Sequence, residues 1–145
     1  MADRRGSAVW NGDLFGGSGT VTFESSGATG PLPVTWAART EESGGKTSPE
    51  ELIAAAHAAC FSMSLSNILA QAGNAPEELR TSATATFAKT DAGFRITRMA
   101  LEVTGTVPGI DQAAFDEKAQ EAKVACPVSN AVTGIPDISV TATLA

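Results

Sequence analysis

The hydrophobic and polar positions of the first forty residues predict three short strands over 7–10, 20–24 and 34–38. The glycine-rich segment 16–19 lies between the first two strands. It favours a hairpin turn, because glycine takes positive φ without steric cost. A phosphate-binding loop is the alternative, but no Lys-Ser/Thr pair follows the glycines and no helix begins there. We therefore interpret the segment as a turn.

The longest apolar stretch predicts a helix from Pro49 to about Ala72. Ser48 is the expected N-cap, Pro49 suits the first helical position, and Glu51 completes a capping box. Gly73 supplies the stop at the other end. Apolar residues lie on nearly every side of this helix, which predicts that it is buried all round. One chain of 145 residues has few ways to surround it, so its alanine-rich surface predicts packing against the same helix of a second subunit.

The second half of the chain predicts a hairpin, a helix and a last strand. Alternation over 81–89 and 94–107 predicts the two strands of the hairpin. Residues 111–125 follow a helical period, and 138–144 alternate so that one face is buried. The order is βββ-α-ββ-α-β, an α+β fold with antiparallel strands covered by helices. We expect residues 1–145 to form one domain.

Composition narrows the classes of partner. The formal charge of −6 and the pI near 4.7 argue against nucleic acid and anionic membrane surfaces, which attract basic proteins. Polar residues interrupt the apolar stretch 52–70, which argues against a membrane span. No secretory signal is recognisable at the N-terminus, so we expect a cytoplasmic protein. Small molecules and proteins remain as partners.

The chain has two cysteines in unlike settings. Cys60 lies inside the apolar helix, and Cys126 directly precedes Pro127 at the end of the second predicted helix. Burial in an apolar helix raises the pKa of a thiol, so a reactive Cys60 would need a nearby cation. In a reducing compartment a pattern of two cysteines is more often catalytic or metal-binding than a permanent disulfide. The alternative for Cys126 is a purely structural role as a buried apolar residue, because most free cysteines are buried.

His57 lies one helical turn before Cys60, so both side chains share a face. It either activates the thiol or, as we favour, is a structural residue whose imidazole binds a neighbouring carbonyl. A zinc site made of His57, Cys60 and Cys126 lacks a fourth ligand and any familiar spacing. The hypothesis of a hydrolase that uses Ser62 or Ser64 with His57 has still less support, because neither an acidic residue nor a nucleophile-elbow motif accompanies these serines.

Several longer motifs resemble segments of the OsmC/Ohr family, in the same order along the chain. The similarity is to the OsmC branch, chiefly through residues 54–63, which read AAAHAACFSM. The other motifs are Ala8-Val9-Trp10, Gly12-Asp13, Ser48-Pro49-Glu50-Glu51-Leu52, Asp91-Ala92-Gly93-Phe94, Val107-Pro108-Gly109-Ile110, Ala122-Lys123 and Cys126-Pro127-Val128-Ser129. Together they cover essentially the whole chain.

The resemblance implies the OsmC-like fold, an intertwined homodimer with two active sites at the subunit interface, and a thiol peroxidase for stress defence. Such an enzyme reduces organic hydroperoxides, and hydrogen peroxide to some extent, without haem, metal or flavin. By motif, Cys60 is the peroxidatic cysteine and Cys126 the resolving one. Glu50 matches the active-site glutamate and Arg39 the arginine of the OsmC branch. An external dithiol, of lipoyl type or on a protein, would restore the thiols.

These roles agree with the chemistry of the residues. An arginine beside Cys60 favours the thiolate that burial opposes, and Glu50 would hold the guanidinium in a bidentate pair. The peroxide converts the thiolate to a sulfenic acid, which condenses with Cys126 to a disulfide. Glu50 and Cys60 lie about 15 Å apart along one helix. We therefore expect a composite site in the dimer, with Arg39 braced by a glutamate of the other subunit.

Two other functions stay open. A non-catalytic OsmC-like stress or binding protein would use its cysteines for packing alone. A general thiol-disulfide oxidoreductase would act on protein substrates, but the close Cys-x-x-Cys pair usual in such enzymes is absent.

Overall fold

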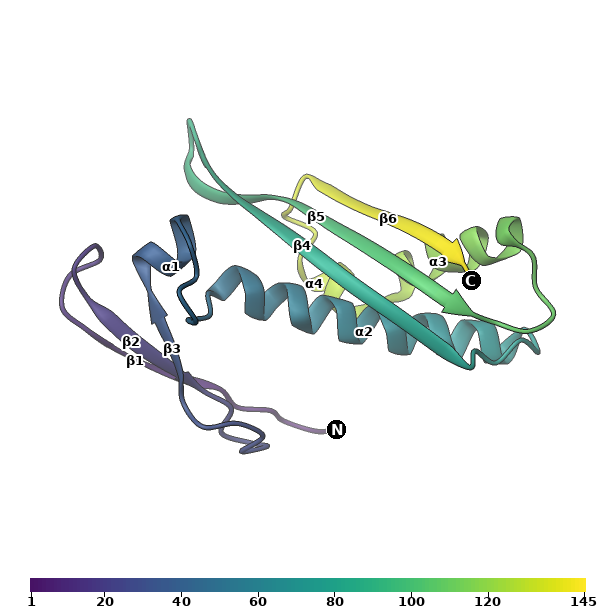
Figure 1. Ribbon diagram of the computed structural model, residues 1–145, viewed down its shortest axis with the longest axis horizontal. Coiled ribbons are helices and arrows are strands. Elements are labelled where there is room, and N and C mark those ends of the chain that lie inside the picture. Colours follow the sequence, from purple (N-terminus) through teal and green to yellow (C-terminus); the bar gives the residue numbers. More distant parts are fainter. The chain divides into compact units, whose positions relative to one another are not determined.

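Two three-stranded sheets organise the chain, which a computed structural model describes over residues 1–145 (Figure 1). They belong to two units, residues 1–52 and 53–145. In chain order the elements are β1 (Ser7–Asn11), β2 (Ser18–Thr22), β3 (Leu32–Thr35), α1 (Trp36–Thr40), α2 (Pro49–Gln71), β4 (Glu78–Thr90), β5 (Gly93–Thr106), α3 (Gln112–Ala125), α4 (Pro127–Ala131) and β6 (Asp137–Leu144). The expectation that residues 1–145 form one domain stays a prediction.

The first unit contains the antiparallel sheet β1-β2-β3. The predicted hairpin between β1 and β2 is present, but the glycines act differently from the prediction. Gly12 has the positive φ, 89°, whereas Gly17 and Gly19 do not. A Cβ atom on Gly17 would overlap the carbonyl oxygen of Asp13, and one on Gly19 would overlap that of Val9. These two glycines are therefore required for close backbone approach.

Residues 36–40 form the short helix α1, so the strand predicted over 34–38 is wrong from Trp36 onward. The Thr35 hydroxyl accepts a hydrogen bond from the backbone N–H of Ala38 at 3.1 Å, which makes Thr35 an N-cap. Strand β3 therefore ends at Thr35, and helix α1 begins at Trp36. Arg39 consequently lies in the last turn of α1.

Helix α2 begins and ends close to the predicted positions. The Ser48 hydroxyl accepts from the backbone N–H of Glu51 at 3.1 Å. The carboxylate of Glu51 accepts from the Thr47 hydroxyl at 2.6 Å, so only half of the predicted capping box forms. Gly73, with φ of 84°, follows the helix as predicted, and the N–H of Asn74 donates to the Leu69 carbonyl.

One face of α2 is buried within the single chain, and the burial of its other faces against a second subunit stays a prediction. The buried side chains are those of Glu50, Ala54, His57, Phe61, Leu65 and Leu69. Met63, on another face, is 74% exposed. Helix α2 is long and apolar enough to cross a membrane, but the core helix of a soluble protein can have the same length and composition. Because its buried face lies in the hydrophobic core, we assign α2 as a core helix.

In the second unit, α2 runs along the sheet formed by β4, β5 and β6 (Figure 1). Strands β4 and β5 form the predicted antiparallel hairpin. Strand β6 pairs with β5 in parallel, and this corrects the prediction of an all-antiparallel sheet. The reason is the connection: α3 and α4 return the chain to the end at which β5 begins, as a crossover helix does between parallel strands.

Helix α3 begins where predicted, with the Asp111 carboxylate accepting from the backbone N–H of Ala114 at 2.8 Å. Its residue Phe115 is completely buried against β5. A further short helix that was not predicted, α4, begins at Pro127. Cys126 stands between the two helices as the last residue capping α3 and the first capping α4.

Candidate active site

The fold of the second unit brings the two cysteines together. Cys60 comes from the middle of α2, and Cys126 from the junction of α3 and α4. Both are free thiols within hydrogen-bonding reach of each other. Cys126 is completely buried, and Cys60 is partly exposed. This arrangement places an accessible thiol next to a protected one.

The surroundings of the two thiols differ electrostatically. Burial raises the pKa of Cys60; the backbone N–H of Val128 opposes this, but the neighbouring Cys126 raises it further. Burial also raises the pKa of Cys126, but hydrogen bonding by the backbone N–H of Ser129, the Cys60 thiol and the Ser129 hydroxyl lowers it below its ordinary value. Cys126 is therefore the more acidic thiol in the single chain.

His57 is completely buried on the same side of α2 as the packed core residues. Its Nε2 lies 2.7 Å from the hydroxyl oxygen of Ser129. The predicted partner, a neighbouring carbonyl, is therefore wrong. Its other ring nitrogen, Nδ1, is buried without a hydrogen-bond partner. Burial lowers the pKa of His57, so the imidazole is neutral near pH 7.

Arg39 and Glu50 form an ion pair within the first unit. The Nε atom of Arg39 donates to both carboxylate oxygens of Glu50, at 2.9 and 3.1 Å, and Nη2 donates to Oε1 at 2.7 Å. Glu50 is buried, and the Arg39 guanidinium lies 5.7 Å from the centre of the Trp36 ring. Glu50 holds the arginine of its own chain. This corrects the expectation that a glutamate of the other subunit braces Arg39.

An apolar cavity of about 330 Å³ adjoins this ion pair. Its lining residues are Ala8, Trp10, Leu14, Val21, Val34, Thr35, Trp36, Arg39 and Pro49. The Arg39 guanidinium is the only charged group among them. The cavity therefore suits an apolar molecule that carries one polar or developing negative group.

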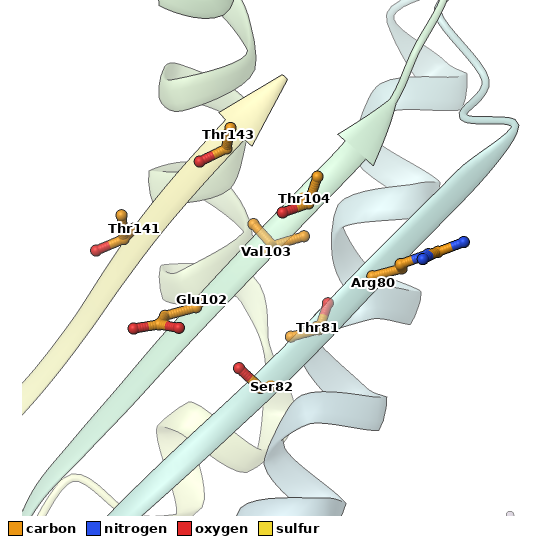
Figure 2. A pocket seen from close by; sticks show the side chains of 8 residues that line it. All are labelled: Arg80, Thr81, Ser82, Glu102, Val103, Thr104, Thr141 and Thr143. Atoms are coloured by element: carbon orange, nitrogen blue, oxygen red, sulfur yellow. The ribbon is translucent and has the colours of Figure 1, made fainter. Parts of the chain in front are cut away.

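A second hollow, of about 340 Å³, lies on the outer face of the sheet β4-β5-β6, with the helices behind the strands (Figure 2). Hydroxyl groups dominate it: its lining residues are Arg80, Thr81, Ser82, Glu102, Val103, Thr104, Thr141 and Thr143. No thiol or imidazole lines it, and Arg80 forms an exposed pair with Glu78.

Two alternatives from the sequence lack the necessary geometry. No three His, Cys, Asp or Glu side chains are grouped to hold a metal ion, so His57, Cys60 and Cys126 do not form a zinc site. The Ser62 hydroxyl lies 2.9 Å from the Ala58 carbonyl and 2.7 Å from the Thr81 hydroxyl. Because His57 binds Ser129 instead, no serine-histidine pair of the predicted kind forms.

Sequence reasoning missed two residues of the site. Ser129 contacts both His57 and Cys126. In the sequence it lies three residues after Cys126, with Pro127 between them, and this spacing could have indicated that the two residues interact. Trp36 lies three residues before Arg39, the helical spacing that brings two side chains together. Because we predicted a strand over 34–38, the helical spacing of Trp36 and Arg39 was not recognised.

Comparison with known proteins finds relatives both in sequence and in structure. The family model described as OsmC-like protein matches residues 42–141. Peroxiredoxin OsmC of Escherichia coli (strain K12) is 49% identical over 126 residues, which cover 87% of each chain. The organic hydroperoxide resistance protein of Xanthomonas axonopodis pv. citri (strain 306) is 36% identical over 99 residues, 68% of each chain. The crystal structure of an OsmC-like protein from Mycoplasma pneumoniae aligns over 99% of this chain and 97% of that one, with a TM-score of 0.74 at 19% identity, which shows a shared fold.

Proposed function

We propose that this chain, which belongs to the OsmC-like protein family, is a thiol-dependent peroxidase. It reduces organic hydroperoxides to alcohols, and hydrogen peroxide to water, in antioxidant defence. The peroxiredoxin and organic hydroperoxide resistance relatives support this activity. The observation that carries it is the pair of free thiols, one partly exposed and one buried, that meet between α2 and the α3–α4 junction.

The reaction proceeds in three steps. The Cys60 thiolate attacks the outer peroxide oxygen, the O–O bond breaks, and the alkoxide takes a proton to leave as the alcohol. Cys60 is now a sulfenic acid. The Cys126 thiolate attacks its sulfur, and the hydroxyl group leaves, with a proton, as water. An external dithiol then reduces the Cys60–Cys126 disulfide by exchange and is itself oxidised to a disulfide.

Arg39 supplies the cation that Cys60 needs, and Glu50 fixes its orientation. Cys60 is ten positions beyond Glu50 on the continuous helix α2, about 15 Å along the axis. A guanidinium bound to Glu50 is therefore best placed to serve Cys60 of a partner subunit. The functional unit is a homodimer in which the Arg39–Glu50 pair of one subunit faces Cys60 of the other.

The exposed face of α2 supports the dimer. Ala55, Ala59 and Met63 are exposed on this helix, although all three are apolar. Small residues allow a second helix to approach closely. Burying this face against the same helix of a partner would remove apolar surface from water, at about 25 cal/mol per Å².

The apolar cavity beside Arg39 favours an organic hydroperoxide over hydrogen peroxide, because apolar walls stabilise a hydrocarbon substituent. The catalytic cycle requires two thiols and an external dithiol, and it needs no haem, metal or flavin. The acidic chain acts in the cytoplasm, without binding nucleic acid or a membrane.

Dithiol-driven consumption of cumene hydroperoxide and of hydrogen peroxide tests the function in wild type, Cys60→Ser and Cys126→Ser. Cys60→Ser should lose turnover of both peroxides. Cys126→Ser should still form the Cys60 sulfenic acid, but its turnover should no longer pass through the intramolecular disulfide. Ser64→Ala, on the same helix, is the matched control and should keep full activity.

An insulin-reduction assay on the same proteins separates the alternatives. A general thiol-disulfide oxidoreductase would reduce insulin faster than it consumes the hydroperoxide. A non-catalytic binding protein would show no difference between wild type and Cys60→Ser in either assay. Either result would overturn the peroxidase proposal.

A further inference from the structure

Cys126, Ser129 and His57 form a buried hydrogen-bonded chain that the peroxidase cycle above does not use. His57 and Cys126 have no exposed surface, and Ser129 is almost as deeply buried. The Ser129 hydroxyl lies between the other two side chains, 2.7 Å from His57 Nε2 and within hydrogen-bonding reach of the Cys126 thiol. Buried polar side chains that contact a reactive group have a direct electrostatic effect on it, because no water screens them.

The direction of the hydrogen bonds follows from proton counting. A hydroxyl group has one hydrogen to donate. If Ser129 donates it to the Cys126 thiolate, the bond to His57 must come from the imidazole, with Nε2–H as the donor. A neutral imidazole has one N–H, so Nδ1 is then an acceptor without a hydrogen. No acceptor lies beside the buried Nδ1 to receive a hydrogen bond, which agrees with a tautomer that carries its hydrogen on Nε2.

We propose that His57 and Ser129 form a relay that holds Cys126 as a thiolate, ready to attack the sulfenic acid of Cys60. Ser129 touches the reacting thiol, whereas His57 is a positioning residue that acts through the Ser129 hydroxyl. This inference rests on the peroxidase function proposed above. It explains why the only histidine of the chain is buried opposite the resolving cysteine.

The relay changes the second step of the cycle. The Cys126 thiolate forms a new S–S bond to Cys60 as the S–O bond of the sulfenic acid breaks. The sulfur of Cys126 is oxidised and that of Cys60 is reduced. The proton that Cys126 gave up on ionising combines with the departing hydroxide to form water. A faster second step also shortens the time in which more peroxide can oxidise Cys60 to the irreversible sulfinic acid.

The groups that face Cys126 are few. Cys60 and His57 are the titratable side chains of α2 on this side, and Ser129 and the backbone N–H groups of α4 complete the surroundings. Lys123, the cation of α3 nearest in sequence, points its ammonium group to the carbonyl of Ile138 at 3.4 Å. The relay is therefore the main side-chain influence on Cys126 once Cys60 is oxidised.

The first test is a titration of Cys126 by the ultraviolet absorbance of its thiolate, in a Cys60→Ser background where it is the only cysteine. Ser129→Ala should raise the titration midpoint by about one to two pH units, the effect of one hydrogen bond to a charged group. His57→Leu should raise it in the same direction by less. Ser129→Thr and His57→Gln, which keep the donors, should move it little, and Ser82→Ala, on the outer sheet face, should not move it (Figure 2).

The second test follows Cys60 itself in the chain with both cysteines, by trapping the sulfenic acid with dimedone after one equivalent of cumene hydroperoxide. In Ser129→Ala the sulfenic acid should disappear about 10- to 100-fold more slowly at pH 7 than in Ser82→Ala. Ser129→Thr should restore the fast decay. Mass spectrometry should show more sulfinic acid at Cys60 in Ser129→Ala when peroxide is in excess.

The outcomes separate this inference from the proposed function. If sulfenic acid forms but neither the titration nor its decay changes in Ser129→Ala, the relay is overturned and the peroxidase stands. If no sulfenic acid forms in any protein while the titration moves as expected, the coupling of the relay to Cys126 is supported and the peroxidase is overturned. Should His57→Leu fail to fold, Ser129→Ala and Ser129→Thr decide the question alone.

Discussion

The Arg39 guanidinium binds the Glu50 carboxylate of the same chain through two nitrogen atoms, with a shortest nitrogen-oxygen distance of 2.7 Å. Glu50 lies in the first turn of α2, and its side chain is only 8% exposed. A buried carboxylate without its partner would be strongly unfavourable, so the pair orients the guanidinium firmly. In the proposed dimer this orientation directs the Arg39 guanidinium toward Cys60 of the other subunit.

Replacing Arg39 by lysine should lower peroxidase activity while leaving the charge in place. Lysine has one ammonium group and cannot form two parallel hydrogen bonds to Glu50. We expect kcat/KM for cumene hydroperoxide to fall by about 10- to 100-fold, the effect of a misplaced charged hydrogen bond. Steady-state kinetics with a fixed dithiol concentration measure this.

Arg80→Lys is the matched control, because Arg80 also pairs with a glutamate, Glu78, but on an exposed strand. Surface pairs of this kind contribute little. Its kinetics and its unfolding midpoint should equal those of wild type. Equal losses in Arg39→Lys and Arg80→Lys would contradict a specific role for Arg39.

Gly105→Ala should destabilise the second unit. A Cβ atom at this position would lie 2.5 Å from Cζ of Phe115 and 3.1 Å from Cδ2 of Leu79, and Phe115 is completely buried. Overpacking of a core typically costs about 1–3 kcal/mol in the free energy of unfolding. Urea denaturation measures the loss. Gly134→Ala, where a Cβ atom meets nothing within 4 Å, is the control and should not be destabilised.

A partial rescue would identify the clash as the cause. Phe115→Leu removes the ring atoms that the new methyl group meets, at the cost of a smaller core side chain. In the double variant with Gly105→Ala the two losses should therefore be less than additive. Full additivity would show that the alanine acts through something other than Phe115.

The stability of the protein should fall between about pH 7.5 and pH 5.5 because of His57. Burial lowers the pKa of His57 below its ordinary value of 6.5, so the unfolded chain binds the proton more tightly than the folded one. As the pH falls through 6.5, protonation therefore favours unfolding, by at most about 1.4 kcal/mol per pH unit for one proton. Above that pH the penalty is absent.

Urea midpoints over this pH range should fall in wild type and stay nearly constant in His57→Gln. Since His57 is the only histidine, no other histidine contributes to the difference. The same slope in both proteins would show that His57 is not the group responsible.

Met63→Glu should dissociate the proposed homodimer and abolish peroxidase activity together. Met63 is 74% exposed on α2, and a charge there would be buried if two such helices pack together. Size-exclusion chromatography with light scattering measures the mass. Val124→Glu, at an equally exposed apolar position on α3, is the control and should stay dimeric. A dimeric and active Met63→Glu would contradict packing through this face.

Local signals in the sequence predicted the elements whose ends depend on neighbouring residues. The Ser48 cap and the Gly73 stop act within a few residues of α2, so its bounds were correct. The α+β class followed from the order of the predicted elements and the family from long motifs such as residues 54–63, and the structure and the comparisons confirm both. The proposed peroxidase activity followed from the same motifs, and the relatives support it. The roles of Cys60, Cys126, Arg39 and Glu50 stay predictions from the same motifs.

The tertiary structure decided what depends on distant segments. Local pattern cannot tell whether β6 pairs with β5 in parallel, because the crossover through α3 sets that direction. The apolar faces of α2 look alike in sequence, but the sheet and α3 cover only one of them. His57 binds Ser129, which is 72 positions away, and only a folded chain brings the two together. Short-range hydrogen bonds can be predicted from neighbours, whereas these contacts form only when packing brings remote segments into one core.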